Sequence, residues 1–442
     1  MFDQQEEQRV RRTSVELFAG GGGLAQAVEL AGFRALLVNE HAPRACETLA
    51  ANHYALLPAG AKPEPPADGE ACPLVAGDVQ KVDFDRFEGK VDLLAGGPPC
   101  QPFSLGGIAK GDEDKRNMFP EMFRAIREIK PKAVICENVR GLLRPSFRDY
   151  FDYIKRELEL PFLERVDGTD WKTHLAALEK AKTRGDVDPT ERYEVVMTEV
   201  NAADYGVPQI RNRVILVAFR ADLGVDVEAF RKSVQEPPAG DWYSEKALIR
   251  SMMLGDYWAR HGDAIPPDVR ARVEARLPKV LPEDDGRKPW RTLRDALQGI
   301  REGERPLPEI PLHEQDRKKE HGGIAYHVGW PDARKYDGHT PNELDRPAKT
   351  VKAGVHGVPG GESVIELDQR APVPGKAGEW EYLYRYMTVR ETARVMTFPD
   401  TWKLEGPRGE KMRQLGNAVP VMLGEFFANA VARALDGVPE GK

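Results

Sequence analysis

One cysteine of this chain lies in a segment that suits a nucleophile. Residues 96–104 read Gly-Gly-Pro-Pro-Cys-Gln-Pro-Phe-Ser, which places Cys100 directly after two prolines. Each proline fixes φ and lacks an amide donor, so we expect a rigid loop. A thiol held on such a loop near helix amides can have a pKa well below its free value of about 8.5. Cys100 is therefore a candidate nucleophile, although a lone cysteine is more often buried and inert.

An acid and two arginines border other apolar segments. Glu137 comes directly after the segment 132–136, and Arg211 and Arg213 precede the apolar run 214–219. A carboxyl group at the end of a buried strand can act as a general acid, or it can form an ordinary ion pair. Arg211 and Arg213 would share one face of an extended segment. They would line the same site as Glu137, or form a basic pair on the surface.

The N-terminal part carries a glycine cluster that suits a nucleoside ligand. Gly20–Gly23 lie between a predicted strand, Ser14–Phe18, and a predicted helix, Leu24–Ala31. Such a turn exposes helix amides and lets a ligand approach the backbone, although a tight βα turn would need the same glycines. The pattern is not GxGxxG, and Glu40 follows about 20 residues later, where a carboxylate can bind ribose hydroxyls. Together these features favour an adenosine-containing ligand without a pyrophosphate.

These candidate residues share a position at the ends of predicted strands. The predicted strands are 14–18, 35–39, 74–79, 91–95, 132–136, 193–200 and 213–219, and the helices between them cover 24–31, 45–52 and 118–129. The alternation predicts an α/β fold with a doubly wound, mainly parallel sheet. The candidate residues would then meet at the edge of the sheet where such folds bind ligands. They follow the strands as Gly20–Gly23, Glu40, Asp78, Pro99-Cys100 and Glu137.

The sequence changes character after residue 220. Residues 221–363 are rich in proline and poorly periodic, with helical fragments at 244–260, 267–277 and 292–300, and helices resume at 388–396 and 416–432. We expect a smaller domain, 221–404, inserted into a larger domain formed by residues 1–220 and 405–442.

The motifs occur in the order found in the DNA cytosine-5 methyltransferases. Pro99-Cys100-Gln101 resembles the nucleophile loop of that family, and 18–23 resembles its cofactor loop. Further resemblances lie at Glu137–Val139, Gln209–Arg213, Arg390–Asp400 and Gly416–Pro420. The motifs span nearly the whole chain, with 157–192 as an extra insertion. The chain thus resembles the bacterial restriction–modification type of this family, which implies a Rossmann-like methyltransferase fold with an inserted target-recognition domain.

The resemblance implies that a methyl group moves from S-adenosylmethionine to carbon 5 of cytosine in a specific double-stranded DNA sequence. The Cys100 thiolate would add to carbon 6 of a flipped cytosine and make carbon 5 nucleophilic. Glu137, if its surroundings keep it protonated, would serve ring N3, and Asn138 would hold Glu137 or the cysteine loop. Of Arg211 and Arg213, one would lie near O2 of the base and the other would orient the cysteine loop or Glu137.

The resemblance also implies the ligand contacts. S-adenosylmethionine, released as S-adenosylhomocysteine, would contact Phe18, Ala19, Gly20, Gly22, Gly23, Glu40, His41, Asp78, Val79, Pro99, Met118, Asn417 and Val419. DNA would contact Gln101 and Ser104 of the cysteine loop, and Arg346, Lys349, Lys352 and His356 of the inserted domain, which would read the major groove. Phe18 would serve equally well as a core residue, and the four residues of the inserted domain as ordinary loop residues.

Composition places weaker limits on function. A net charge of −7 alone argues against a nucleic-acid partner, but residues 286–352 hold 14 Lys and Arg against 11 Asp and Glu. The sequence lacks a run of about 18 apolar residues, so we expect no membrane span. Its four cysteines lack a CxxC pair, so we expect no metal site and a reducing cytoplasm. We expect a monomer, with a restriction endonuclease of the same system as a candidate partner.

Three other functions compete with DNA methylation. An RNA cytosine-5 methyltransferase would use the same scaffold, but the Cys-Phe-Thr tripeptide of a related tRNA-modifying branch does not occur here. A DNA-binding relative without catalysis would not need Cys100, Glu137 and the two arginines. A thymidylate-synthase-like nucleotide methylase would not need the cofactor loop or the inserted domain.

Overall fold

The structure is a computed structural model that describes residues 12–99, 117–238, 240–335, 340–353 and 364–438. The chain divides into two compact units. Unit 1 comprises Met1–Val200, Asn212–Glu236 and Gly424–Lys442, and unit 2 comprises Asn201–Arg211 and Pro237–Leu423. Residues 201–211, 221–236 and 405–423 therefore lie on the other side of the expected boundaries. The assignment of catalysis and DNA recognition to separate domains stays a prediction.

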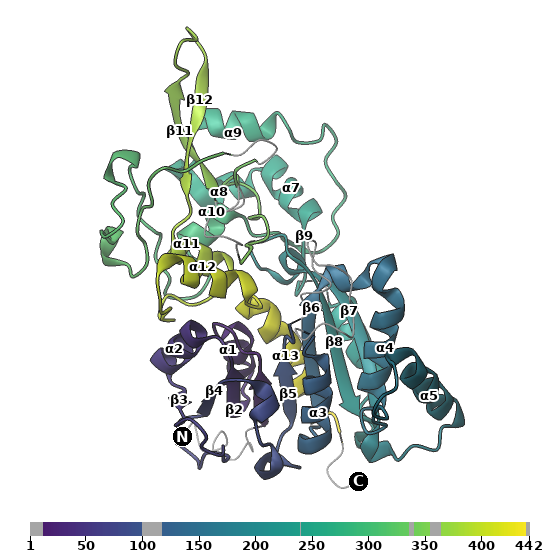
Figure 1. Ribbon diagram of the computed structural model, residues 1–442. Coiled ribbons are helices and arrows are strands. Elements are labelled where there is room, and N and C mark those ends of the chain that lie inside the picture. Colours follow the sequence, from purple (N-terminus) through teal and green to yellow (C-terminus); the bar gives the residue numbers. More distant parts are fainter. Residues whose placement is uncertain (1–11, 100–116, 239, 336–339, 354–363, 439–442) are drawn as a thin grey trace, which may run out of the picture. The chain divides into compact units, whose positions relative to one another are not determined.

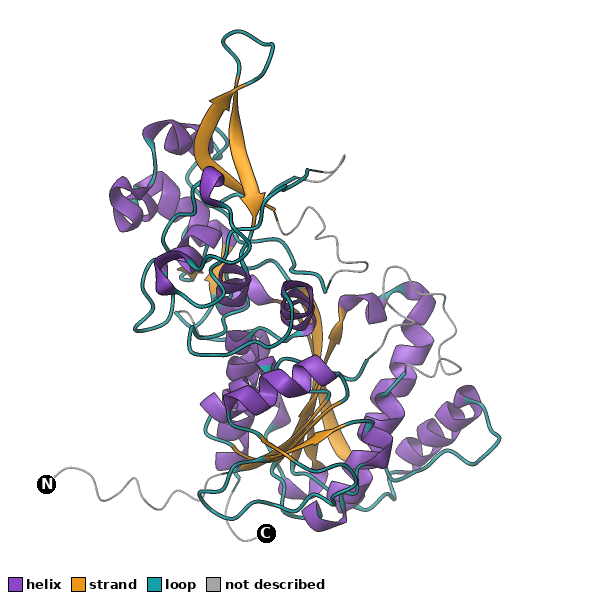
Figure 2. Cartoon of the chain, turned by 60° about the vertical axis from the view of Figure 1, so that its left-hand side comes forward, coloured by secondary structure: helices purple, strands orange, loops and turns teal. Residues whose placement is uncertain are grey.

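Unit 1 is built on a sheet with the strand order β3-β4-β2-β1-β5-β6-β8-β7 (Figures 1 and 2). β1 pairs in parallel with β2 and β5, β2 with β4, and β5 with β6, whereas β8 is antiparallel to β6. The strands are β1 Thr13–Leu17, β2 Arg34–Glu40, β3 Ala55–Leu56, β4 Pro73–Ala76, β5 Leu93–Gly96, β6 Ala133–Val139, β7 Tyr193–Asn201 and β8 Asn212–Arg220. The mainly parallel, doubly wound sheet is the one that the sequence predicts.

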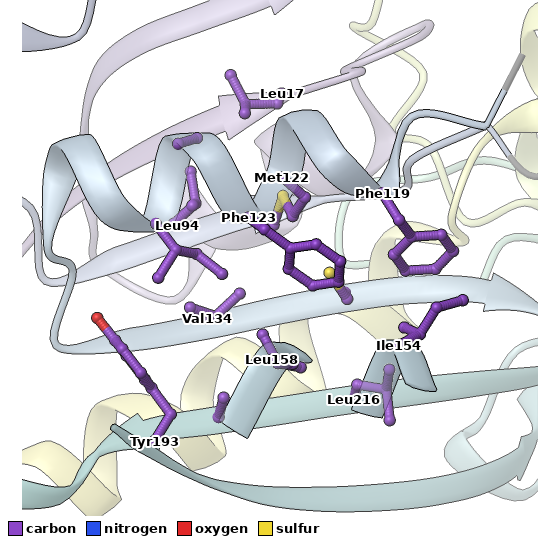
Figure 3. Packing of buried hydrophobic residues seen from close by; sticks show 14 of the residues in the cluster. Leu17, Leu94, Phe119, Met122, Phe123, Val134, Ile154, Leu158, Tyr193 and Leu216 are labelled. Atoms are coloured by element: carbon purple, nitrogen blue, oxygen red, sulfur yellow. The ribbon is translucent and has the colours of Figure 1, made fainter. Parts of the chain in front are cut away.

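Helices cover both faces of this sheet (Figure 2). They are α1 Gly23–Leu30, α2 Pro43–Asn52, α3 Phe119–Ile129, α4 Arg148–Glu159, α5 Trp171–Arg184 and α6 Val227–Gln235, and α13 Val421–Asp436 follows near the C-terminus. One apolar layer packs α3 and α4 onto the sheet. Figure 3 shows Phe119 and Phe123 of α3 beside Val134 and Leu216 of the sheet. Buried positions of α3 recur every three or four residues, as an amphipathic helix requires.

The segment expected as an insertion contains α5, which the sequence analysis does not predict. Figure 1 shows α4 and α5 beside β7 and β8. Two ion pairs join α5 to α4, from Lys182 to Glu159 at 2.6 Å and from Arg156 to Glu179 at 2.9 Å. Leu178 of α5 is fully buried in the main apolar layer. The inserted helix is therefore part of the core of unit 1.

Unit 2 consists of short helices and strands joined by long loops. Its helices are α7 Glu245–Leu254, α8 Asp256–His261, α9 Pro267–Glu274, α10 Leu293–Gln298, α11 Val389–Val395 and α12 Arg408–Asn417, and its strands are β9 Tyr243–Ser244, β10 Lys288–Pro289, β11 Val364–Pro372 and β12 Trp380–Tyr386. A core cluster includes Tyr257 and Trp258 of α8. The antiparallel pair β11 and β12 extends beyond the helices of the unit (Figures 1 and 2), and the sequence analysis does not predict it.

Buried charges hold α11 in unit 2. Arg385 binds Glu391 at 2.6 Å, and Arg394 binds Asp400 at 2.6 Å. Burial is the largest influence and would raise the pKa of Glu391, but the charge and hydrogen bonds of Arg385, with His327 and the Thr388 amide, together outweigh it and bring that pKa to about 2. Thr388 caps the helix in a box with Glu391. The motif 390–400 therefore acts first as a structural anchor.

Two helical predictions need correction at single residues. The expected helix 244–260 divides into α7 and α8, because Gly255 has a φ of 96° and ends α7 in the left-handed region. The expected helix 416–432 begins late, because α12 ends at Asn417 and Pro420 separates it from α13.

One helical stretch, Arg408–Asp436, is long and apolar enough to cross a membrane by length and composition. Its most apolar window is 61% buried within the protein, as in the core helix of a soluble protein. A buried core helix meets the same criterion, so this stretch is weak evidence for a membrane span.

β1 also buries an acid, Glu16, on the face of the sheet opposite to Val15 and Leu17. Glu16 is 5% exposed, and the backbone of Ala25 in the first turn of α1 only partly offsets the effect of burial on the pKa of its carboxyl group. Burial raises the pKa of Glu16 well above its usual value, and the charges of Glu29 and Glu40 raise it further. The folded protein therefore retains a proton on Glu16 at pH values where the unfolded chain has lost it.

This proton predicts a pH dependence of stability. Stability should fall as pH rises above about 4.5, the pKa of a solvated Glu, toward the higher pKa of the folded protein. Glu16→Gln should remove this slope and raise the Tm at pH 8 by about 2–4 °C, on the order of 1 kcal/mol. Thermal unfolding between pH 5 and 8 checks this, with Glu47→Gln at an exposed position as control. An unchanged slope in Glu16→Gln would refute the assignment.

Candidate active site

The turn after β1 approaches β5 closely. Phe18 has a φ of 59°, in the left-handed region that non-glycine residues rarely adopt, and Gly20 and Gly22 have φ values of 55° and 88°. A Cβ on Gly96 at the end of β5 would lie 2.8 Å from the carbonyl oxygen of Leu17. A glycine at position 96 is therefore required for the two strand ends to meet. The strained Phe18 backbone at this edge is typical of a functional turn.

Glu40 ties the ends of β1 and β2 together. One carboxylate oxygen accepts the amide of Gly20 at 2.6 Å, and the other accepts the amide of Ala42 at 2.7 Å. Each carboxylate oxygen can accept a second hydrogen bond. The carboxylate can therefore hold the glycine turn and still accept hydroxyl donors.

An ion pair lies at the end of β6. Nε of Arg213 on β8 is 2.9 Å from Oε1 of Glu137, and both side chains are almost buried. A Cβ on Gly97 would lie 3.4 Å from Oε2 of Glu137, so the chain after β5 passes directly beside the carboxylate. Asn138 donates from Nδ2 to the carbonyl oxygen of Pro98 at 3.1 Å. This contact fixes the chain two residues before Cys100, and the role of Asn138 in holding Glu137 or the cysteine loop stays a prediction.

The cysteine segment begins and ends at this edge. Cys100, Gln101 and Ser104 lie outside the described residues. The residues on either side of that segment are joined, because the amide of Met118 donates to the carbonyl oxygen of Pro99 at 3.3 Å. The chain on both sides of residues 100–116 therefore lies close to Gly97 and Glu137.

The other cysteines are poor nucleophiles. Cys46, Cys72 and Cys136 are buried. Burial raises the pKa of Cys46 and of Cys136 to about 12, and it raises the pKa of Cys72 further. Thiols that stay protonated near neutral pH react slowly. Of the four cysteines in the sequence, Cys100 therefore remains the candidate.

The other expected cofactor residues of unit 1 occupy different surroundings. Asp78 accepts the amide of Gln80 at 3.1 Å, whereas His41 is exposed. The side chain of Val79 is buried in the main apolar layer, and Met118 packs against that layer. Phe18 also packs against it, so its alternative role as a core residue remains open. Cofactor contacts by all of these residues stay predictions.

The arginines of the Gln-x-Arg-x-Arg motif contact different parts of the chain and do not share one surface. Arg211 is 1% exposed and donates to the carbonyl oxygens of Val351, Gly416 and Ala418, each at 2.9 Å. A buried guanidinium requires several such acceptors. A role for Arg211 at the base stays a prediction, whereas its contacts join remote segments of unit 2.

Gln209 belongs to the junction that Arg211 forms with Val351, Gly416 and Ala418. It is fully buried, its Oε1 accepts the amide of Val351 at 3.0 Å, and its Nε2 is 3.0 Å from the sulfur of Met396. In the sequence, Gln209 stands out only as the first residue of the motif Gln209–Arg213. Burial of a long polar side chain is not visible in the sequence, so the junction could not be predicted from it.

The C-terminal motif 416–420 packs against residues 351–353, the segment that Arg211 and Gln209 also contact. A Cβ on Gly416 would overlap the amide nitrogen of Ala353 and the carbonyl carbon of Lys352. Asn417 is exposed and Val419 is buried in unit 2. Their contact with the cofactor stays a prediction.

The expected DNA-contacting residues of the inserted domain lie in or near residues 346–356. Arg346 is paired with Glu245 at 3.3 Å, and Lys349 donates to the carbonyl oxygen of Thr340 at 2.6 Å. Lys352 is exposed, and His356 lies outside the described residues. DNA contacts by these residues stay predictions.

The strand order of unit 1 and the helices on both faces of its sheet define a Rossmann-like methyltransferase fold, which confirms the expected class. The fold is similar to that of an E. coli prophage protein described as a DNA modification methyltransferase, with a TM-score of 0.50 and 18% identity, covering 96% of this chain and 99% of that one. A family model described as C-5 cytosine-specific DNA methylase matches residues 12–160 and 186–433. The chain therefore belongs to the C-5 cytosine-specific DNA methylase family.

Curated relatives agree with this family. The Type II methyltransferase M.Eco47II of Escherichia coli is 32% identical over 431 residues, and M.PspPI of Psychrobacter sp. (strain TA137) is 30% identical over 432. Each alignment covers 96% of this chain and 80% of the relative. The resemblance to a restriction–modification cytosine-5 methyltransferase is confirmed, and the protein is an enzyme that methylates cytosine in DNA. The gap in the family match, 161–185, lies within the expected insertion and contains α5.

The tight contact at Gly416 predicts a selective loss of stability. Gly416→Ala should cost about 1–3 kcal/mol, because backbone atoms of residues 352 and 353 occupy the space that the methyl group needs. Gly409→Ala, in the same helix, meets open space and should be neutral or stabilising by up to about 1 kcal/mol. Thermal or denaturant unfolding of both variants measures this difference. Equal effects on unfolding would contradict the packing described here.

Proposed function

We propose that this enzyme transfers the methyl group of S-adenosylmethionine to carbon 5 of a flipped cytosine in a specific duplex sequence, through a covalent bond between Cys100 and carbon 6. The observation that carries the proposal is the pairing of Arg213 with Glu137, directly beside Gly97 and the chain that leads to Cys100. Family membership supports cytosine in DNA as the substrate.

The edge of the sheet suits the cofactor chemically. The glycine turn after β1 offers backbone amides, and the Glu40 carboxylate keeps acceptor capacity for ribose hydroxyls. When bound, S-adenosylmethionine supplies an electrophilic methyl group. We infer that Phe18, Gly20, Gly22, Glu40 and Asp78 hold it.

Cys100 and Glu137 carry the proton and electron movements in this proposal. The Cys100 thiol gives its proton to water, and its sulfur forms a bond to carbon 6 of the cytosine. Electron density moves toward ring N3, which takes a proton from protonated Glu137, and carbon 5 becomes nucleophilic. After methylation, carbon 5 gives its proton to a base such as water, the bond to sulfur breaks, and N3 returns its proton to Glu137, which restores the ring.

Arg213 and Asn138 act on the groups that touch the base. The guanidinium of Arg213 fixes the direction of the Glu137 carboxylate, and Asn138 fixes the Pro98 carbonyl two residues before Cys100. Groups held in this way need no reorganisation during the reaction.

We further propose that unit 2 binds duplex DNA and that the enzyme acts as a monomer. Flipping the target costs a few kcal/mol, which contacts to the flipped base and to phosphates offset. The Type II designation of M.Eco47II and M.PspPI supports a role beside a restriction endonuclease. RNA methylation remains the alternative and is an outcome of the test below.

The first test removes the thiol. Wild-type enzyme with methyl-labelled cofactor should label carbon 5 of cytosine at one short motif in mixed-sequence duplex DNA. Cys100→Ala should give no label, because the bond to carbon 6 cannot form. DNA containing 5-fluorocytosine should trap a covalent adduct with wild type and none with the variant. Labelling by Cys100→Ala, or labelling of RNA but not of DNA, would refute the proposal.

The second test separates Arg213 from a matched arginine. Arg213→Ala should lower kcat by about 10²-fold or more, because Glu137 loses the group that orients it. Arg220→Ala, at the other end of β8, removes a similar pair with Asp222 at 2.7 Å and should leave kcat unchanged. Cofactor binding by calorimetry should be equal in both variants. Equal values of kcat would show that the Arg213 pair is structural only.

A further inference from the structure

Asn117 directly follows the segment that contains Cys100, and its side chain is held inside unit 1. It is 8% exposed, and its Nδ2 donates to the hydroxyl oxygen of Tyr150 on α4 at 2.5 Å. Its Oδ1 accepts the amide of Phe119 in the first turn of α3 at 3.3 Å. Both ends of the amide group are therefore engaged, as burial of a polar side chain requires.

The ring of Tyr150 is held in turn by the inserted helix. Trp171, the first residue of α5, meets Tyr150 edge to face, with ring centroids 5.3 Å apart and planes at 90°. Trp171 also contacts Tyr153, one turn along α4, at 5.7 Å. Edge-to-face pairs of this kind are favourable and restrict ring orientation.

A buried histidine fixes α5 against α4. Nε2 of His174 lies 2.7 Å from the carbonyl oxygen of Leu163, which can only accept, so Nε2 carries the proton. Nδ1 then accepts from the hydroxyl of Tyr153 at 3.1 Å. Burial lowers the pKa of His174, so the neutral ring that these bonds require is favoured. The position of Trp171 is therefore well determined.

The family match shows which of these residues are specific to the insertion. The match stops at residue 160 and resumes at residue 186, so Trp171 and His174 belong to a segment that the family model does not include. Tyr150 and Asn117 lie inside the matched part. The insertion therefore adds a support behind a residue that directly follows the nucleophile segment.

We propose that the insertion 161–185 is a positioning element for methyl transfer, which acts through Trp171 and Tyr150 on Asn117. This inference rests on the proposed function, because it assigns its effect to the reaction of Cys100. Asn117 precedes Met118, whose amide is bonded to the Pro99 carbonyl beside Cys100. A shift of Asn117 would therefore move the junction that brings the two sides of the cysteine segment together.

The test compares two buried tyrosines of unit 1. Tyr150→Phe removes only the hydroxyl that Asn117 binds, whereas Tyr193→Phe removes a hydroxyl that donates to the carbonyl oxygen of Pro131 at 2.8 Å, away from Trp171 and Asn117. Tyr150→Phe should lower kcat, and the rate of adduct formation with 5-fluorocytosine DNA, by about tenfold, with KM for the cofactor unchanged. Tyr193→Phe should leave both rates near those of wild type, with a similar change in Tm. Equal rates in the two variants would overturn the proposal.

A second pair of variants tests the insertion itself. Trp171→Leu should reproduce the slower adduct formation of Tyr150→Phe, and Leu175→Ala, on the same helix and packed against the same core, should change stability alone. If Tyr150→Phe slows the reaction and Trp171→Leu does not, α4 positions Asn117 without the insertion, and the proposal fails. A failure of the proposed function is separate, because Cys100→Ala would then still methylate DNA.

Discussion

Parallel pairing of β1 with β2 and β5 is the constraint on which the rest of unit 1 depends. It brings the ends of these strands to one edge. Only a glycine fits at position 96 of β5, because a Cβ there would lie 2.8 Å from the carbonyl oxygen of Leu17. The Glu40 carboxylate then bridges the two neighbouring turns, and the Glu137–Arg213 pair closes the next strand end. A cofactor turn and a nucleophile segment can lie together only because these strand ends coincide.

The two arginines of the motif Gln209–Arg213 have different surroundings. Arg213 is directed at a carboxylate in unit 1, and Arg211, two residues earlier, is surrounded by backbone carbonyls of unit 2. Arg213 forms an ion pair with Glu137, whereas the buried charge of Arg211 is stabilised by the dipoles of backbone carbonyl groups. One motif thus serves both the site and the integrity of unit 2, and substitutions at the two positions have different causes.

The sequence predicts much of unit 1, because alternating apolar strands and helices leave a local pattern and polar residues follow the strand ends. Glu40, Asn138 and Glu137 are found at the edge where the pattern places them. Unit 2 is harder, because Gln209 and Arg211 are buried against segments that are remote in the sequence. The pair of Asn117 and Tyr150 is hidden for the same reason, although an asparagine before Phe119-Pro120 is a recognisable helix-start signal.

The junction around Arg211 also affects the order in which the chain can fold during synthesis. Its acceptors include Gly416 and Ala418, and Gly416 packs on residues 352 and 353, so the junction needs nearly the entire polypeptide. At about 5–20 residues per second, the ribosome exposes Arg211 for on the order of ten seconds or more before these acceptors emerge. A nascent chain that must keep a guanidinium hydrated for that time completes unit 2 late, and a truncated product that ends before Gly416 lacks the Gly416 and Ala418 carbonyl acceptors.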